Sequence, residues 1–293
     1  MMSVKPGEIL RDFSFEITCK DISKLDSLMR VAAPGSLVSL TFLPNEDVAA
    51  RIAAASAVRA AGFVPVPHIA ARRLASPEEL EHYLEALVSR AGVDRVFVIA
   101  GDVATIKGPY PDALSVLRSS LLNKYKIAQV GISGYPTGHP KIPDGVLWQA
   151  MRDKLAILAD MGHRAWIMTQ FGFEATAILD WLARSRLEGN NVPVCIGVAG
   201  PSSVRSLLHF AALCGVETSA KVVAKYGLSI GKLLGSVGPD AILKDLASGL
   251  NVPMHGPTAI HFYPFGGLGS LGRWIEEFRR SSEVEVVSRL SAR

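Results

Sequence analysis

The feature that most constrains the fold is an alternation repeated along the 293-residue chain: a short apolar run, then a longer stretch whose apolar residues have helical spacing. Runs this short, bounded by polar residues, Gly or Pro, are typical of buried strands rather than of core helices. The runs cover residues 13–17, 36–42, 63–69, 95–100, 127–132, 165–169, 192–196 and 259–263. Strands that alternate with helices in this way build a parallel sheet.

The first strand–helix junction separates the two common parallel architectures. An open, doubly wound sheet would carry a glycine-rich phosphate turn there, but the junction reads Ile17-Thr18-Cys19-Lys20. The sequence therefore predicts an α/β fold of the (β/α)8 TIM-barrel type. We expect one catalytic barrel over residues 1–280, with extra helices in 217–250 before the eighth strand and a frayed tail over 281–293.

Composition and charge exclude several classes of protein. Hydrophobic residues make up 49% of the chain and charged residues 20%, so a large core can form and disorder is not expected. The net charge of +4 is modest and spread along the chain, which argues against a nucleic-acid partner. No apolar run reaches the roughly 18 residues of a membrane span, and residues 1–6 lack the apolar core of a secretory signal. We expect a cytoplasmic protein without a membrane partner.

The three cysteines are scattered at Cys19, Cys195 and Cys214, with no C-x-x-C spacing. An odd, dispersed set of this kind supports neither a disulfide framework nor a zinc site. We therefore expect no metal. No exposed stripe in the sequence identifies an oligomer interface, so a homo-oligomer is left open.

Polar residues follow or end most of the predicted strands, and in a parallel barrel the carboxyl ends of the strands form the active site. Glu16 stands inside an apolar run, where a carboxylate is costly to bury unless it is paired or used. A structural ion pair is the alternative for Glu16, a turn or helix cap for Asp102, and a rim histidine for His68. The other candidates in these places are Thr41, Arg72, Gly101, Tyr135, His139, Gln170, Glu174, His261 and Tyr263.

Two further segments at this end point to a ligand. The run Gly134-Tyr135-Pro136-Thr137-Gly138-His139-Pro140 contains two prolines and two glycines, which fix an irregular loop of the kind that holds ligands. Gln170 ends a predicted strand with a neutral amide, which can donate and accept at once and so suits the edge of a heteroaromatic ring. A buried hydrogen-bond network is the alternative role for Gln170.

Taken in order, these segments resemble the methylenetetrahydrofolate reductase family. The segments are Ser14-Phe15-Glu16, Pro67-His68, Gly101-Asp102, Gly134-Tyr135-Pro136 through His139-Pro140, Thr169-Gln170-Phe171 and His261-Phe262-Tyr263. The resemblance implies an eight-stranded barrel that reduces 5,10-methylenetetrahydrofolate to 5-methyltetrahydrofolate, in one-carbon metabolism and methionine biosynthesis. It also implies hydride from NAD(P)H, with NADH favoured, and bound FAD as in other flavoproteins of the family.

The resemblance also implies roles for individual residues. Glu16 matches the general acid, and Asp102 matches the carboxylate beside flavin and pterin. Substrate binding falls to Gln170, Phe210 and Tyr263, and flavin contacts to Thr41, His68, Gly101, Asp102, Tyr110, Tyr135 and His139. The chemistry suits these types, because an acid with a raised pKa can protonate a ring nitrogen and a second carboxylate can stabilise the iminium cation that forms.

The chain departs from the family pattern in ways that bear on the flavin. Ala100-Gly101-Asp102 replaces the usual Arg-Gly-Asp, Phe171-Gly172-Phe173 replaces a Phe-rich run, and Pro264-Phe265-Gly266-Gly267 lacks the usual Arg. Arg152 and Lys154 are the nearest matches to the polar flavin contacts of the fifth helix. Direct hydride transfer from NAD(P)H is therefore an alternative to a flavin route. A folate-dependent methyl- or demethyl-transferase and a non-catalytic folate- or flavin-binding barrel are also left open.

Overall fold

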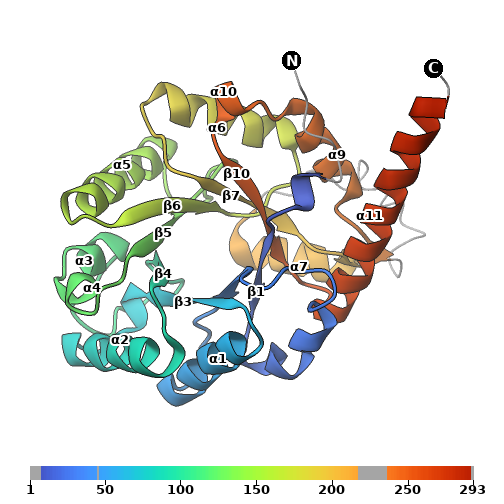
Figure 1. The fold of residues 1–293 in the computed structure, drawn as a ribbon. Coiled ribbons are helices and arrows are strands. Elements are labelled where there is room, and N and C mark those ends of the chain that lie inside the picture. The colour runs from blue at the N-terminus through green and yellow to red at the C-terminus, as the bar shows by residue number, and fades with distance from the viewer. Residues whose placement is uncertain (1–7, 45, 217–235, 292–293) are drawn as a thin grey trace.

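The computed structural model describes residues 8–44, 46–216 and 236–291 of the chain, and its main body is a closed barrel of parallel strands surrounded by helices (Figure 1). The strand order is β1-β10-β7-β6-β5-β4-β3-β2. The strands are β1 Ser14–Ile17, β2 Leu37–Leu40, β3 Val64–Ala70, β4 Arg95–Ile99, β5 Gln129–Gly134, β6 Arg164–Thr169, β7 Val194–Ala199 and β10 Thr258–Tyr263. Each overlaps the run predicted for it, so the predicted (β/α)8 barrel is confirmed.

Local signals explain where several helices begin and end. Ser76 accepts a hydrogen bond from the Glu79 amide and Pro77 opens α2, as the sequence indicates, while Gly92 ends the helix with φ of 57°. The helices are α1 Val48–Ala60, α2 Pro77–Ala91, α3 Ala113–Leu117, α4 Leu121–Lys124, α5 Asp144–Asp160, α6 Ala175–Leu187, α7 Val204–Cys214, α9 Asp240–Gly249, α10 Val252–His255 and α11 Leu268–Ser291.

Short 3-10 helices fill three connections: η1 Glu8–Leu10, η2 Cys19–Ser27 and η3 Ala71–Arg73. The helix expected after the first strand is thus a 3-10 helix. Its sequence, CKDISKLDS, is rich in Asp and Ser, whose side chains compete with α-helical hydrogen bonds. At its start, Thr18 and Asp21 form a capping box.

The segment before β10 contains α9 and α10, in agreement with the extra helices expected there, although residues 217–235 lie outside the described part. A short antiparallel pair, β8 Ser202–Ser203 and β9 Ser236–Val237, flanks that gap. The backbone of α11 stays helical to Ser291, through most of the segment predicted as a frayed tail. The domain boundary at residue 280 stays a prediction.

The two faces of the strands differ in character. Outward residues such as Phe15, Val98 and Ile196 join the main core with the helices. Inside the barrel, Val66, Phe97, Trp166 and Met168 form an apolar cluster. Gly131 makes room for it, because a Cβ there would overlap the Trp166 ring and lie 2.8 Å from Phe97. Other inward positions on β1, β3 and β10 carry polar groups: Ser14 and Glu16, His68, and His261.

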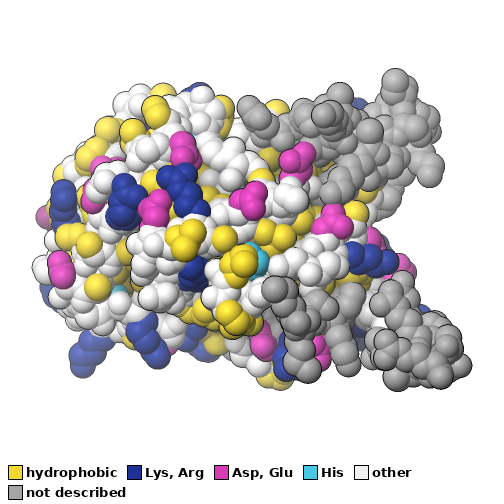
Figure 2. Space-filling view, turned by 90° about the horizontal axis from the view of Figure 1, so that it is seen from above, with side chains coloured by type: hydrophobic (Ala, Val, Ile, Leu, Met, Phe, Trp, Pro, Cys, Tyr) yellow, Lys and Arg dark blue, Asp and Glu magenta, His cyan; other side chains and the backbone are white. Residues whose placement is uncertain are grey.

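The charge on the surface is dispersed. Figure 2 shows Lys and Arg side chains interspersed with Asp and Glu on one face, with hydrophobic side chains in a band between them. In the described part of the chain, no helix is both long and apolar enough to cross a membrane.

Candidate active site

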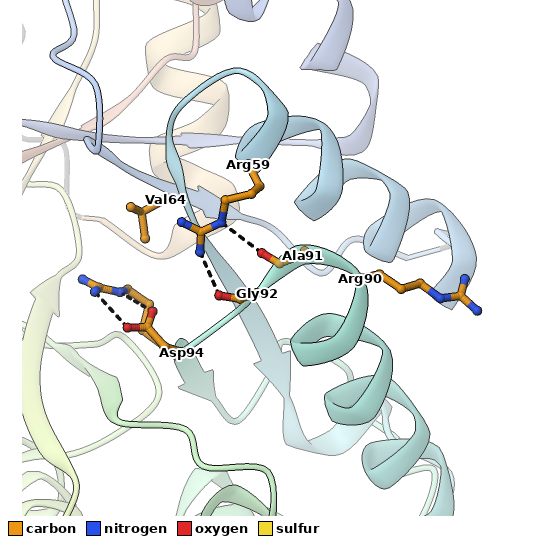
Figure 3. A pocket seen from close by; sticks show the side chains of 7 residues that line it. Arg59, Val64, Arg90, Ala91, Gly92 and Asp94 are labelled. Atoms are coloured by element: carbon orange, nitrogen blue, oxygen red, sulfur yellow. Dashed lines mark hydrogen bonds and ion pairs between the residues drawn. The ribbon is translucent and has the colours of Figure 1, made fainter.

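One hollow lies at the amino end of the barrel, and it can be set aside as the active site. A hollow of about 450 Å³ lies where β3 and β4 begin (Figure 3). Arg59 donates there to the carbonyl oxygens of Ala91 and Gly92 at 3.0 and 2.8 Å, and Arg95 pairs with Asp94 at 3.0 Å. These charges are already partnered. The amino end of such barrels serves stability, so we place the candidate site at the opposite end.

A carboxyl group and an imidazole meet inside the mouth of the barrel. Glu16 of β1 and His68 of β3 both face inward, and Glu16 Oε2 lies 3.5 Å from His68 Nε2. Burial raises the pKa of Glu16 to about 8 and lowers the pKa of His68 to about 3. At neutral pH both groups are therefore uncharged, and the pair is a contact between neutral groups rather than a salt bridge. Glu16 holds a proton there.

A second buried histidine lies beside this pair. His261 of β10 is 0% exposed, and its Nδ1 is 2.8 Å from the hydroxyl of Ser14 on β1. Burial and the neighbouring His68 lower the pKa of His261 to about 3. The sequence placed His261 at a strand end but gave no sign of its pairing with Ser14.

Several buried polar atoms on β2, β3 and β10, and just after β2, have no hydrogen-bond partner among the described residues. They are Ser39 Oγ, Thr41 Oγ1, His68 Nε2 and His261 Nε2. Buried polar atoms normally bond to something, so this side of the mouth offers hydrogen-bonding capacity to a bound molecule. A polar ligand is a better fit here than an apolar one.

The opposite side of the mouth is built from β6, β7 and β10. The Tyr263 hydroxyl donates to the Thr169 carbonyl at 3.1 Å. The ring passes over Gly197, where a Cβ would lie 2.9 Å from it, so only glycine fits. Burial raises the pKa of Tyr263 well above its usual value, and the charge of Glu16 adds to this shift. The Tyr263 side chain therefore reaches from β10 across β7 to β6.

Gln170 follows β6 directly, continuing the inward alternation of Trp166 and Met168. Its Oε1 accepts a hydrogen bond from the Phe171 amide at 3.1 Å. This bond from the backbone of the next residue fixes the side chain and leaves the amide N–H groups to donate elsewhere. The predicted role of Gln170 as a ligand-binding amide is compatible with this position.

Aromatic rings continue the same wall. Phe210 of α7 stacks on Phe265 with ring centroids 4.2 Å apart and planes at 10°, and Phe265 lies 5.9 Å from Tyr263. The structure thus brings two predicted substrate contacts, Phe210 and Tyr263, to one surface. Phe265 was not singled out from the sequence, where its only signal is an aromatic residue just after the eighth strand.

Asp102 lies on the rim rather than inside. Gly101, with φ of 88°, turns the chain after β4, and the Asp102 side chain is 84% exposed and bonded to Arg73. The charges of Glu16 and Asp102 both contribute to raising the pKa of Cys214 at the end of α7, after burial. Glu16 near the end of β1 and Asp102 after β4 lie toward the carboxyl end of the parallel barrel, although the structure shows no contact between them. The sequence alone did not foresee the bond to Arg73.

With this geometry in view, comparison with known proteins identifies the family. Residues 20–233 match the family described as methylenetetrahydrofolate reductase. The chain belongs to the methylenetetrahydrofolate reductase family. The resemblance inferred from the ordered strand-end segments is thereby confirmed.

Solved structures agree on the fold. A protein from Clostridium thermocellum, described as uncharacterised and binding two copies of 5-methyl-5,6,7,8-tetrahydrofolic acid, matches with a TM-score of 0.62 at 12% identity, over 93% of this chain and 95% of that chain. Dihydropteroate synthase from Thermus thermophilus matches at 0.47 and 13% identity, over 92% and 93%. The second likeness is too weak to carry an argument.

The positions that match flavin contacts in the methylenetetrahydrofolate reductase family are dispersed in this member. Tyr135 packs edge-on against His139 at 5.6 Å, and His139 Nδ1 accepts from the Lys141 amide of its own loop at 3.2 Å. Tyr110 is 6% exposed and part of the main core. Thr41 and His68 face the barrel interior, and Asp102 is held by Arg73.

Helix α5 offers little more to a flavin. Its buried face consists of Trp148, Met151, Lys154 and Leu158. Of the two cations considered from the sequence, Arg152 bonds to Glu188 at 2.8 Å, and burial lowers the pKa of Lys154 to about 8. A flavin dinucleotide needs several convergent polar partners. Helix α5 adds no such set to the unpartnered atoms at the mouth, and the seven flavin contacts stay predictions.

Proposed function

We propose that this member of the family reduces 5,10-methylenetetrahydrofolate to 5-methyltetrahydrofolate with hydride from NAD(P)H. The single observation that carries the proposal is the state of Glu16, a carboxyl at the barrel mouth whose pKa is raised to about 8 beside a neutral imidazole. At neutral pH it is a proton donor. Opening the methylene bridge begins with protonation of a ring nitrogen, which such a group can perform.

The other residues have roles that their positions support. Gln170 is positioned to donate to the edge of the pterin ring, and Phe210 and Tyr263 provide an aromatic wall for flat rings. The Asp102 carboxylate, on the rim at the same end, stabilises the iminium cation left by ring opening. The nicotinamide supplies the hydride. Because Ala100 stands where the family has Arg before Gly-Asp, and Arg152 of α5 is already bonded to Glu188, we propose that the hydride passes to the folate directly.

The test combines an absorbance spectrum of the purified protein with an assay of NAD(P)H oxidation in the presence of methylenetetrahydrofolate. We expect a colourless protein, nicotinamide oxidation only when the folate is present, faster turnover with NADH, and 5-methyltetrahydrofolate as the product. Flavin bands that bleach with NADH would instead indicate the flavin route.

Two other outcomes would contradict the reductase proposal. Methyl transfer to or from an added acceptor without nicotinamide would indicate a transferase. Folate binding with no turnover under any donor would indicate a binding barrel. The folate-binding component alone is supported by the fold-level match to a protein described as binding 5-methyltetrahydrofolate.

A further inference from the structure

Arg73 is a buried cation that ends η3, the turn that follows β3. Only 8% of its side chain is exposed, whereas the carboxylate that it bonds, Asp102, is 84% exposed. The Arg73 Nη2–Asp102 Oδ1 distance is 2.5 Å. We propose that Arg73 is the positioning residue for Asp102, holding that carboxylate in the orientation that catalysis uses. This inference rests on the proposed reductase function, in which Asp102 stabilises a cation.

The unequal burial of the two partners decides which of them holds the other. A guanidinium remains protonated in proteins, and a buried charge without a partner is strongly unfavourable. Among the described residues, Asp102 is the one acidic group that bonds to Arg73. The carboxylate therefore has to stay where the buried guanidinium can reach it. An exposed pair without this asymmetry would be far looser.

The adjacent residue, Arg72, has a different role on the same loop. Its backbone N–H donates to the Ala100 carbonyl at 2.9 Å, and its carbonyl accepts from the Lys107 amide at 3.1 Å. Its Nε donates to the Pro111 carbonyl at 2.7 Å. These bonds hold the backbone of the loop that follows β4. They do not touch the Asp102 side chain, whose bond is to Arg73.

Backbone packing also fixes this loop. A Cβ on Gly108 would overlap the Ala75 carbonyl oxygen, so the loop lies directly against the chain that follows Arg73. With the backbone held independently, removing the Arg73 side chain should release the carboxylate rather than the whole loop. The two arginines thus allow a matched comparison.

The geometry of the bond leaves the carboxylate usable. Arg73 engages Oδ1, and Asp102 Oδ2 has no hydrogen-bond partner among the described residues. One oxygen is thus anchored, while the other belongs to a side chain that is 84% exposed. The charges of Glu16 and Asp102 both raise the pKa of Cys214 at this end of the barrel. A carboxylate anchored in this way can act on a developing positive charge without first being ordered.

The test is a double-mutant cycle with Arg73→Gln, Asp102→Asn and the combined variant, each measured for kcat and KM. We expect Arg73→Gln to lower kcat by about 10-fold with little change in KM, and Asp102→Asn to lower it by at least as much. Because Arg73 acts through Asp102, the combined variant should match Asp102→Asn within about 2-fold. Arg73→Lys should recover part of the loss, since an ammonium can replace one of the donors.

Arg72→Gln is the matched control. It removes a neighbouring guanidinium that holds the loop but not the carboxylate, so its effect on kcat should multiply with that of Asp102→Asn. Multiplying effects of Arg73→Gln and Asp102→Asn would overturn the inference, as would a folded Arg73→Gln with unchanged kcat. If Arg73→Gln does not fold, Arg73→Met, which keeps apolar volume without a buried charge, takes its place in the cycle.

Failure of the reductase proposal is recognised separately. If the wild-type protein shows no turnover, that proposal fails, and the same cycle is then measured as the Kd for 5-methyltetrahydrofolate by fluorescence quenching. Non-additive changes in Kd would support the positioning role at a binding site. Additive or absent changes would overturn it.

Discussion

Two carboxyl groups at the same end of the barrel have opposite surroundings. Glu16 is inside, 19% exposed, with a neutral imidazole 3.5 Å away and a pKa raised to about 8. Asp102 is on the rim, 84% exposed, and bonded to a buried guanidinium. The difference teaches that the environment, not the residue type, sets which acid can give a proton at neutral pH. Only Glu16 is arranged for that role, while Asp102 has a fixed position and a charged partner.

Replacing each acid by its amide tests this comparison, and the largest effect belongs to Glu16. We predict that Glu16→Gln lowers kcat by roughly 100-fold or more, because it removes the proton donor, whereas Asp102→Asn costs on the order of 10-fold, the smaller loss expected for an exposed stabilising charge. Initial-rate measurements at neutral pH check both.

The control for these variants is Glu81→Gln, which removes a carboxylate of α2 that pairs with Lys124 on the outer surface and should leave kcat unchanged. A larger loss for Asp102→Asn than for Glu16→Gln would reverse the comparison and reassign the acid. The alkaline side of the wild-type kcat/KM profile should fall near pH 8, following the Glu16 pKa of the free protein.

The sequence predicts features that depend on neighbouring residues, but not contacts between residues far apart in the chain. The strands were predictable because buried parallel strands are apolar in short runs, and Glu16 was noticeable because it interrupts one of them. The pairing of Ser14 with His261 was not predictable, since 247 residues separate them. It depends on β1 and β10 being neighbours in the closed barrel.

The direction in which a loop side chain points is the second feature that the sequence does not predict. Arg73 follows a strand as an ordinary charged residue, so nothing in the sequence indicates that it is buried and reaches Asp102. The resemblance implies flavin contacts for Tyr110 and His139, yet Tyr110 packs into the core and His139 bonds within its own loop. Residue type and position along a strand do not say which way a loop side chain turns.

A smaller effect is expected on the affinity for the folate, and it tests the role of Gln170 inside the barrel mouth. We predict that Gln170→Ala raises the KM for methylenetetrahydrofolate by about 10-fold, because it removes an oriented amide from the ligand site. The KM for NADH should change far less, and the alkaline limb near pH 8 should persist, since Glu16 is untouched. Steady-state kinetics with each substrate varied in turn measure these values. Equal changes in both KM values would contradict the assignment of Gln170 to the folate.

The smallest expected effect is on the pH dependence of folding stability. It distinguishes the environments of Glu16 and Asp102 without any substrate. The pKa of Glu16 rises from 4.5 to about 8 on folding, so the folded state binds the proton more tightly than the unfolded state. Its contribution to stability is full below about pH 4.5 and is lost as pH rises through about 8. The pKa values of His68 and His261 fall from 6.5 to about 3, so their contributions are lost as pH falls through that range.

Between about pH 6.5 and 8 the contributions of His68 and His261 are nearly constant, and a slope that the wild type shows and Glu16→Gln lacks is due to Glu16. We predict that the Tm of Glu16→Gln minus that of the wild type increases by a few degrees as pH rises across this window. This corresponds to a loss of about 1–3 kcal/mol in the contribution of Glu16 to the free energy of unfolding. The Tm of Asp102→Asn should change with pH in parallel with the Tm of the wild type. Thermal melts in matched buffers give the three curves. If Glu16→Gln also runs parallel, Glu16 is already ionised at neutral pH, and the environment that distinguishes it from Asp102 does not make it an acid.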